Sequence, residues 1–248
     1  MSETLIELRA VSKAFGEAQV LDGVDLEVAR GETVAILGAS GSGKTVTLKT
    51  INGLLSPDQG SVEVLGFPVS ELEERALVPL RQRVSYLFQW GALFDSMTVA
   101  ENLAFPILEH RRLSREEVPN RVAELLAMVQ LEGIEALYPA ELSGGMRKRV
   151  ALARALALNP EIILYDEPTT GLDPVTARTI AQLIVGLHRH LGVTSVLVTH
   201  EISLVNRVAG RVVFLHEGRF IYSGPPSDAA VNGPDTVREF FAAGGGDA

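Results

Sequence analysis

The stretch that most constrains this chain is residues 38–45, which read GASGSGKT and match the phosphate-binding pattern G-x-x-x-x-G-K-[ST]. The preceding residues, 33–37, read TVAIL and form a short apolar run typical of a buried parallel strand. Apolar residues then recur at near-helical spacing, at Val46, Leu48, Ile51 and Leu55. Strand, glycine loop and helix thus follow in the order that phosphate binding requires. A glycine-rich turn that binds nothing is the alternative.

The residue types of this loop suit a nucleotide phosphate. Backbone N–H groups must converge on phosphate oxygens, and Cβ atoms at the glycines would block that approach. Lys44 adds a positive charge toward the β- and γ-phosphates, and the Thr45 hydroxyl can ligate Mg²⁺. The loop residues expected to bind the nucleotide are Gly38, Ser40, Gly41, Ser42, Gly43, Lys44 and Thr45.

Two further apolar runs end in residues with useful chemistry. Residues 162–165 are followed by Asp166 and Glu167, and residues 195–198 are followed closely by His200. In an open parallel sheet, ligands bind beyond the carboxyl ends of the strands, so we expect these groups to meet one nucleotide. Asp166 suits Mg²⁺ coordination, and Glu167 suits a general base that orients water. His200 alone is weak evidence, because a lone histidine is more often structural.

Residues 142–145, LSGG, form a serine-glycine turn at a predicted helix N-terminus, which is an anion site by geometry. A chain with one phosphate loop has no obvious need for a second such turn. The need appears if two copies face each other, with this turn of one copy closing on the γ-phosphate held by the other. Asp173 and Pro174 predict the start of another helix, which ends near Gly192.

The remaining pattern predicts the elements around this core. Short strands are expected at 4–8, 11–15, 24–28 and 61–65, and a hairpin at 211–215 and 219–222. Surface helices are expected at 70–83 and at 114–130, where Ser114-x-x-Glu117 forms a capping box. The tail adds an amphipathic piece at 237–241 and flexible glycines at 244–246. The apolar cluster at 90–94, WGALF, is typical of a partner surface.

Composition narrows the function classes. The chain has 248 residues, no cysteine and a net charge of −9, so disulfides and thiolate metal sites are excluded. This charge argues against nonspecific binding to nucleic acid and against electrostatic adhesion to anionic lipid. The N-terminus lacks the pattern of a signal peptide, and no apolar stretch is long enough to span a bilayer. Any membrane role is therefore expected to come through a partner.

Six motifs together, in this order, resemble the ATPase subunit of ABC transporters: GASGSGKT, Gln89, LSGGM, IILYDE, GLD at 171–173 and His200. The resemblance covers nearly the whole chain. It implies an α/β fold: a P-loop NTPase (RecA-like) core with an antiparallel β subdomain and an inserted α-helical subdomain. The implied division is a core at 1–90 and 160–224, a helical signature subdomain at 91–159 and a tail at 225–248.

The resemblance also implies roles, with ATP and Mg²⁺ as cofactors. Phe15 would stack on adenine, although its spacing alone fits a core residue under the hairpin equally well. Gln89 would touch Mg²⁺, and it would relay nucleotide state to a membrane partner. Ser143, Gly144, Gly145 and Asp173 would contact ATP across a homodimer. Asp166 and Glu167 would form the metal-binding and catalytic pair, and His200 would be the switch histidine. The fifth signature residue is methionine where many members have glutamine, which bears on subfamily.

A narrower resemblance concerns cargo. The stretch FQWGALFDSMTVAENLAFP at 88–106, LSGGMRKRVALARALA and the VREFF near the C-terminus resemble lipid-trafficking ABC ATPases that work with MCE-domain proteins, including the Mla phospholipid system. This implies a peripheral subunit at the cytoplasmic face of the inner membrane. Its partners would be a polytopic permease and an MCE-domain protein, and a small regulatory protein would bind the helical subdomain. The alternatives are an ATPase for another small solute, and a soluble ATPase that acts on ribosomes or DNA.

Overall fold

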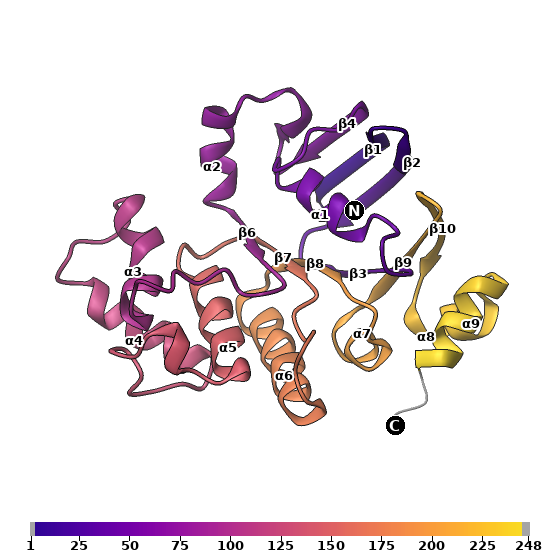
Figure 1. Cartoon of the computed structure of the whole chain (residues 1–248). Coiled ribbons are helices and arrows are strands. Elements are labelled where there is room, and N and C mark those ends of the chain that lie inside the picture. The colour runs from indigo at the N-terminus through magenta and orange to yellow at the C-terminus, as the bar shows by residue number, and fades with distance from the viewer. Residues whose placement is uncertain (1–2, 245–248) are drawn as a thin grey trace.

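The computed structural model describes residues 3–244, which fold as two sheets with helices around them (Figure 1). The antiparallel sheet has the order β2-β1-β4-β5 and consists of β1 (Thr4–Phe15), β2 (Ala18–Ala29), β4 (Gln59–Val64) and β5 (Phe67–Pro68). The larger sheet has the order β10-β9-β3-β8-β7-β6 and consists of β3 (Thr33–Leu37), β6 (Val84–Leu87), β7 (Ile162–Asp166), β8 (Thr194–Val198), β9 (Arg211–His216) and β10 (Arg219–Gly224).

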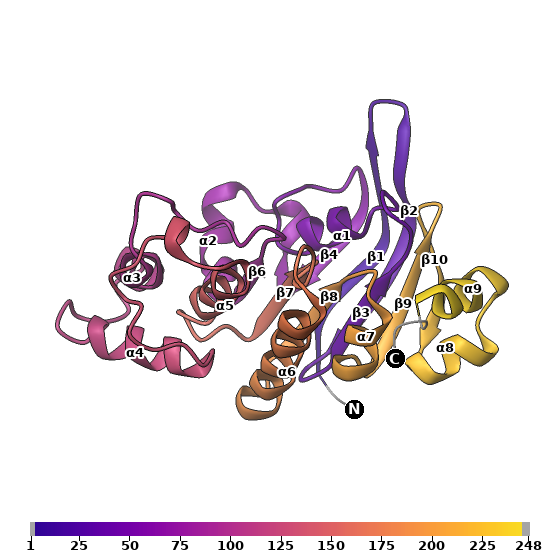
Figure 2. The same cartoon turned by 60° about the horizontal axis from the view of Figure 1, so that its bottom comes forward.

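The helices follow the chain order. They are α1 (Lys44–Ile51), α2 (Val78–Arg81), α3 (Val99–Glu109), α4 (Val118–Met128), α5 (Gly144–Ala155), α6 (Pro174–Leu191), α7 (Ile202–Val208), α8 (Pro226–Asn232) and α9 (Asp235–Gly244). Helix α1 lies between the two sheets, and α6 and α7 cover the opposite face of the larger sheet (Figure 1). Helices α3, α4 and α5 extend from one end of the molecule, and α8 and α9 lie at the other (Figure 2). This is the predicted α/β architecture.

The central strands of the larger sheet are parallel, as their apolar runs predict. Strand β3 pairs in parallel with β8 and β9, and β7 pairs in parallel with β8 and β6. Every residue of β3, β7 and β8 is buried. Because side chains alternate along a strand, each strand supplies two cores. Ala35 and Leu37 pack with the helical side, whereas Val34 and Ile36 pack with α1 and the antiparallel sheet. The carboxyl ends of these strands therefore share one edge.

The prediction of separate strands at 4–8 and 11–15 is wrong, because β1 runs through both. Its register against β2 shifts between Leu8 and Val11, where Ala10 has a positive φ of 48°. The backbone N–H of Ala10 donates to Asp25 Oδ1 at 2.8 Å. This side chain replaces a ladder partner at the irregular position, so the strand bends without ending.

Two helix predictions also need correction. The segment 70–83 forms two 3₁₀ turns, Val69–Glu71 and Glu74–Leu77, followed by the four-residue α2, with Leu72 extended between the turns. The helix expected over 114–130 begins only at Val118 in α4, where Pro119 occupies the first turn. The backbone N–H and hydroxyl of Ser114 both donate to Glu117 Oε2 there, at 2.9 and 2.8 Å. That pair therefore closes a separate turn before α4.

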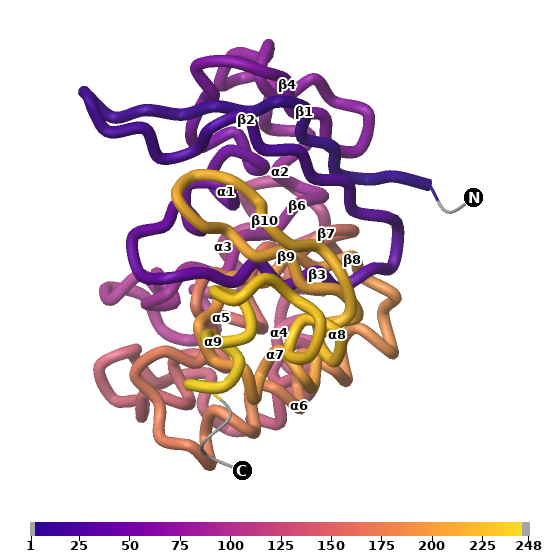
Figure 3. The backbone as a smooth tube through the Cα atoms, turned by 90° about the vertical axis from the view of Figure 1, so that its right-hand side faces the viewer, coloured from indigo at the N-terminus to yellow at the C-terminus, as the bar shows by residue number. Residues whose placement is uncertain are grey.

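Other boundaries follow the predictions closely. Asp173 caps α6, and Gly192 ends it in the left-handed conformation with φ 64°. The 211–222 hairpin forms as β9 and β10, and 237–241 lies inside α9. Helices α8 and α9 lie beside β9, β10 and α7 (Figure 3). Of the glycines expected to be flexible, Gly244 is instead the last residue of α9, and 245 and 246 lie outside the described residues. Within residues 3–244, no helix has the length and apolarity needed to cross a membrane.

Candidate nucleotide-binding site

The phosphate loop takes a conformation that depends on its glycines. Gly38 and Gly43 have φ of 151° and 105°. A Cβ atom on Gly38 would lie 2.3 Å from the Leu215 carbonyl oxygen, and one on Gly43 would lie 2.9 Å from that of Val20. Both neighbours are backbone atoms in or beside strands, so a larger residue would displace the loop. The loop thus joins β3 to α1 with its N–H groups close to the edge shared by the strand ends.

Lys44 is buried, and its amine curls back onto the loop. Its Nζ donates to the carbonyl oxygens of Gly38 and Ala39, both at 2.9 Å. Burial lowers the pKa of Lys44, while the nearby carboxylates of Glu167 and Asp166 act in the opposite direction. The buried hydroxyl of Ser42 has no hydrogen-bond partner within the described residues. Lys44 and Ser42 therefore provide donors suited to an anion in the loop.

The oxygen groups expected to hold Mg²⁺ meet at the end of β7. The Thr45 hydroxyl donates to Asp166 Oδ1 at 2.8 Å, and the Tyr86 hydroxyl donates to Asp166 Oδ2 at 2.8 Å. Burial and the Asp166 carboxylate raise the pKa of Tyr86, so its phenol remains a donor. A hydroxyl and one carboxylate fit Mg²⁺, which keeps several water and phosphate ligands. Among the described residues, no cluster of three acidic, histidine or cysteine side chains offers a metal cage.

Glu167 follows Asp166 in a strained conformation, with a positive φ of 49°. Its Oε1 lies 3.1 Å from His200 Nδ1, and its Oε2 accepts from the Thr170 hydroxyl at 3.1 Å. Its backbone N–H donates to the Val198 carbonyl at 2.9 Å, which ties it to the end of β8. The carboxylate is therefore held by His200 and Thr170, and its backbone is tied to β8, so it is not left free at the strand end.

Glu167, Thr170 and His200 line one cleft of about 740 Å³, together with Phe15, Gln89 and most of the phosphate loop. Asp166 is not among its lining residues and reaches the site through its hydrogen bond with Thr45. Phe15 is 49% exposed, so it does not fill the core beneath the hairpin. Phe240 of α9 also lines the cleft and packs edge-on against Phe214, with ring centroids 5.1 Å apart. Sequence reasoning missed Tyr86 and Phe240, because neither belongs to a motif. Only contact in the fold connects them with the site.

The serine-glycine turn and Asp173 lie outside this cleft. Ser143 begins α5, and its hydroxyl accepts from the Met146 N–H at 3.2 Å. Asp173 begins α6 and accepts from the N–H of Thr176 at 3.0 Å. A Cβ atom on Gly145 would lie 2.4 Å from Thr176 Cγ2, so the two helix starts are in close contact. The fold thus groups these residues with each other and apart from the phosphate loop of the same chain.

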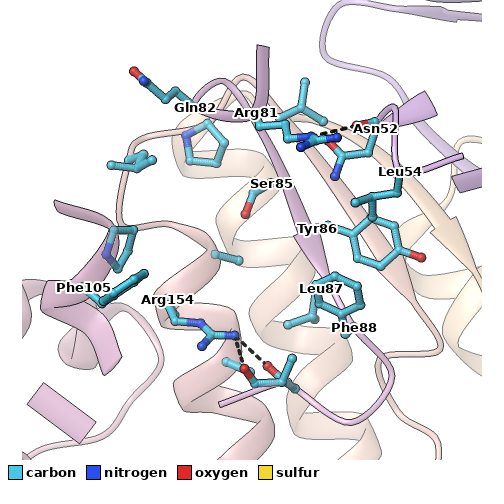
Figure 4. Close-up of a pocket in the computed structure, with 18 of the residues that line it drawn as sticks. Asn52, Leu54, Arg81, Gln82, Ser85, Tyr86, Leu87, Phe88, Phe105 and Arg154 are labelled. Atoms are coloured by element: carbon cyan, nitrogen blue, oxygen red, sulfur yellow. Dashed lines mark hydrogen bonds between the residues drawn. The ribbon is translucent and has the colours of Figure 1, made fainter. Parts of the chain in front are cut away.

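A second hollow, of about 510 Å³, lies between β6, α3 and α5 (Figure 4). Phe94 and Phe105 meet edge-on there, with ring centroids 5.1 Å apart, and the Arg154 guanidinium lies 5.6 Å from the Phe94 ring centroid. Arg154 also donates to the carbonyl oxygens of Gly91 and Ala92, at 3.0 and 2.7 Å. This groove therefore has the segment after Gln89 as one wall, and its apolar side chains are partly exposed.

The parallel sheet, the phosphate loop and the acidic strand end define the chain as a nucleotide-binding cassette of the P-loop NTPase class. Residues 21–170 match the family model described as ABC transporter. The chain belongs to that family, as an ATPase domain.

A solved structure supports the same assignment. It is described as the dimeric ATP-binding cassette MJ0796 in a post-hydrolysis state with ADP and Pi. It is 36% identical to this chain with a TM-score of 0.83, and the match covers 90% of this chain and 99% of MJ0796. The likeness therefore extends over almost the whole of that cassette.

Two named relatives are similar in sequence. The methionine import ATP-binding protein MetN of Brucella abortus (strain 2308) is 42% identical over 224 residues, which cover 90% of this chain and 60% of MetN. The probable ribonucleotide transport ATP-binding protein mkl of Mycobacterium bovis is 40% identical over 236 residues, which cover 95% of this chain and 66% of mkl. The chain thus spans less than two thirds of the length of these relatives.

Proposed function

We propose that this chain hydrolyses ATP and, as one half of a homodimer around two ATP molecules, drives phospholipid transport between inner and outer membranes. It acts as a peripheral subunit at the cytoplasmic face of the inner membrane, with a polytopic permease and an MCE-domain lipid-binding protein. The observation that carries the ATPase part is the convergence of the phosphate loop, Gln89, Glu167 and His200 on one cleft. Membership of the ABC transporter family supports the same reading.

Within the cleft, Glu167 is the general base that activates the attacking water, and His200 holds its carboxylate in place. Lys44 and the loop N–H groups bind the phosphates. Thr45, Asp166 and Gln89 would hold Mg²⁺, which would neutralise the charge that develops on the phosphate. A fixed carboxylate beside the γ-phosphate position favours hydrolysis over simple nucleotide storage.

The residues that lie outside the cleft support the proposed homodimer. Ser143 and Gly144 are exposed at the N-terminus of α5, where free N–H groups favour an anion. Together with Gly145 and Asp173, they close on ATP that is held by a second copy. Phe15 is 49% exposed and lines the cleft, so it offers ring surface on which adenine can stack. The dimeric state described for MJ0796 supports this arrangement.

The permease docks a cytoplasmic segment in the groove beside Phe94. The groove offers partly exposed aromatic side chains, and it borders the segment that follows Gln89. Seating of this permease segment is therefore expected to move the stretch that follows Gln89. Trp90 is 78% exposed and directly precedes Gly91, which lines this groove.

The phospholipid cargo rests on the resemblance of residues 88–106 to lipid-trafficking ATPases. In this proposal the core comprises 1–90 and 160–224, the helical signature subdomain 91–159, and the tail 225–248. Helices α3, α4 and α5 lie together at one end, which supports the second unit (Figure 2). A small regulatory protein binds this helical unit. The net charge of −9 disfavours nucleic acid as a partner.

A second candidate is the ATPase of an importer for a small polar solute. The names of the two relatives favour it, since one is described as a methionine import protein and the other as a probable ribonucleotide transport protein. The cleft chemistry is the same in both candidates. They differ in the permease that occupies the groove.

The test is a pull-down of the tagged chain from detergent-solubilised membranes, followed by mass spectrometry of proteins and lipids. Recovery of a permease with an MCE-domain protein and phospholipid supports the lipid proposal. A permease recovered with a solute-binding protein keeps the ATPase and overturns the cargo. Ribosomes or nucleic acid without a membrane protein would overturn the transport role.

A groove variant sharpens this test. Phe94→Glu places a charge in the groove and is expected to abolish permease recovery and transport while ATP binding, measured with a fluorescent ATP analogue, is unchanged. Tyr138→Glu is the matched control, because Tyr138 is similarly exposed, at 46%, but lies outside the groove. Normal permease recovery with Phe94→Glu would show that the permease docks elsewhere.

A further inference from the structure

Lys148 on α5 is a buried lysine that neither the phosphate loop nor the acidic strand end explains. It is 7% exposed. Its Nζ donates to the carbonyl oxygen of Gln89 and, at 3.3 Å, to that of Glu167. These acceptors lie on two separate segments, one after β6 and the other after β7. The Lys148 side chain therefore connects the segment that carries Gln89 with the segment that carries Glu167.

Burial of an ammonium group is costly unless it is paired. Desolvation lowers the pKa of Lys148, while the carboxylates of Glu167, Asp166 and Glu201 act in the opposite direction. Loss of the amine would leave the carbonyls of Gln89 and Glu167 without this donor. The contact therefore fixes the positions of these two carbonyl groups at a desolvation cost. An apolar side chain at this position would avoid that cost.

Two other basic residues of α5 show what is particular to Lys148. Arg149 donates to the Gln130 carbonyl at 3.1 Å, so it ties α5 to the end of α4, away from the cleft. Arg154 donates to the carbonyls of Gly91 and Ala92 and so holds the groove side of the same loop. Among these three, Lys148 is the one that reaches the Glu167 backbone.

We infer that Lys148 is a positioning residue for hydrolysis, which fixes Gln89 and Glu167 relative to each other and to the helix that begins at Ser143. The Glu167 carbonyl belongs to the residue with φ 49°, so its anchoring maintains the strained backbone that aims the carboxylate. Movement of α5 displaces both segments together. This inference rests on the proposed ATPase function.

The kinetic test compares Lys148→Met and Lys148→Arg with the matched control Arg149→Met. Lys148→Met is expected to lower kcat by about tenfold or more, with KM for ATP changed by less than about threefold. Lys148→Arg, which keeps charge and donors, restores most of kcat. Arg149→Met keeps kcat within about twofold of the unmodified chain. An unchanged kcat for Lys148→Met, or an equal loss in Arg149→Met, overturns the inference.

A second readout needs no hydrolysis. Trp90 is the sole tryptophan of the chain, and it follows Gln89 directly. Without nucleotide, Lys148→Met is expected to lower the fluorescence anisotropy of Trp90, because the segment loses its anchor; Arg149→Met leaves it unchanged. If Lys148→Met fails to fold, Lys148→Gln replaces it. Unchanged anisotropy in the folded Lys148 variant also overturns the inference. If the unmodified chain hydrolyses no ATP, the proposed function fails, and the anisotropy still decides whether Lys148 anchors this segment.

Discussion

The hydroxyl of Tyr86 offers a sharp test of the metal site. Each carboxylate oxygen of Asp166 accepts one hydroxyl, from Thr45 on one side and Tyr86 on the other, both at 2.8 Å. If Thr45 ligated Mg²⁺, as proposed, Tyr86 would remain as the side chain that orients the carboxylate. Tyr86→Phe removes that donor and little else.

The expected size follows from the bond. A hydrogen bond to a charged group contributes about 1.5–3 kcal/mol, which corresponds to about 10- to 150-fold in an equilibrium constant. Groups that orient metal ligands typically change metal affinity by about 10- to 100-fold. We therefore expect half-maximal ATPase activity to require about tenfold more free Mg²⁺, with activity at saturating Mg²⁺ within about threefold of the unmodified chain.

The assay is ATP hydrolysis at fixed ATP across a range of free Mg²⁺. Tyr165→Phe is the control, because it also removes a buried phenol hydroxyl, from the residue that directly precedes Asp166. The side chains of Tyr165 and Leu164 pack on opposite faces of β7. A Mg²⁺ requirement that stays within about twofold in Tyr86→Phe would refute the orienting role. An equal shift in Tyr165→Phe would attribute the effect to the sheet instead.

Three further predictions concern other parts of the chain. Glu167→Gln is expected to keep ATP binding, to lower kcat by about 100-fold or more and to trap a dimer with ATP in analytical ultracentrifugation; hydrolysis at the normal rate would contradict the base role. Gly145→Ala is expected to push Thr176 aside, because its Cβ atom would lie 2.4 Å from Cγ2, and so to weaken ATP-dependent dimerisation but not binding by the monomer; unchanged dimerisation would count against it. Asn102 is fully buried, and its side chain hydrogen-bonds both the backbone N–H and the carbonyl of Phe94. Asn102→Ala is therefore expected to lower the free energy of unfolding, measured in urea, by about 2 kcal/mol. A loss below about 0.5 kcal/mol would show that the Phe94 loop finds other hydrogen-bond partners.

The central sheet was predictable from sequence because its strands are buried on both faces. The apolar run 33–37 coincides with β3 residue for residue, and Asp173 and Gly192 mark both ends of α6. Local chemistry decides these boundaries. At 70–83, charge patterning suggested a helix, but the chain forms short turns whose apolar residues Val69 and Leu77 are buried.

The site was predictable only where motifs exist. Phe15 was ambiguous in sequence, and its exposure in the structure excludes the core alternative. Tyr86, Lys148 and Phe240 belong to no motif, because their partners are distant in sequence. Tyr86 lies 80 residues from its partner and Phe240 lies 26 residues from its own, whereas the two partners of Lys148 are 19 and 59 residues away. Such contacts arise from the crossing of strands and helices, so they become visible only once the topology is known.

Phe240 has a consequence for the end of the chain. Because this residue of α9 lines the cleft and packs on Phe214, nucleotide binding in the cleft is expected to oppose local opening of α9. A saturating nucleotide should slow removal of residues from the C-terminus by a carboxypeptidase. A fusion partner attached after residue 248 would begin within a few residues of that helix, so a purification tag placed at the opposite terminus leaves the cleft wall undisturbed.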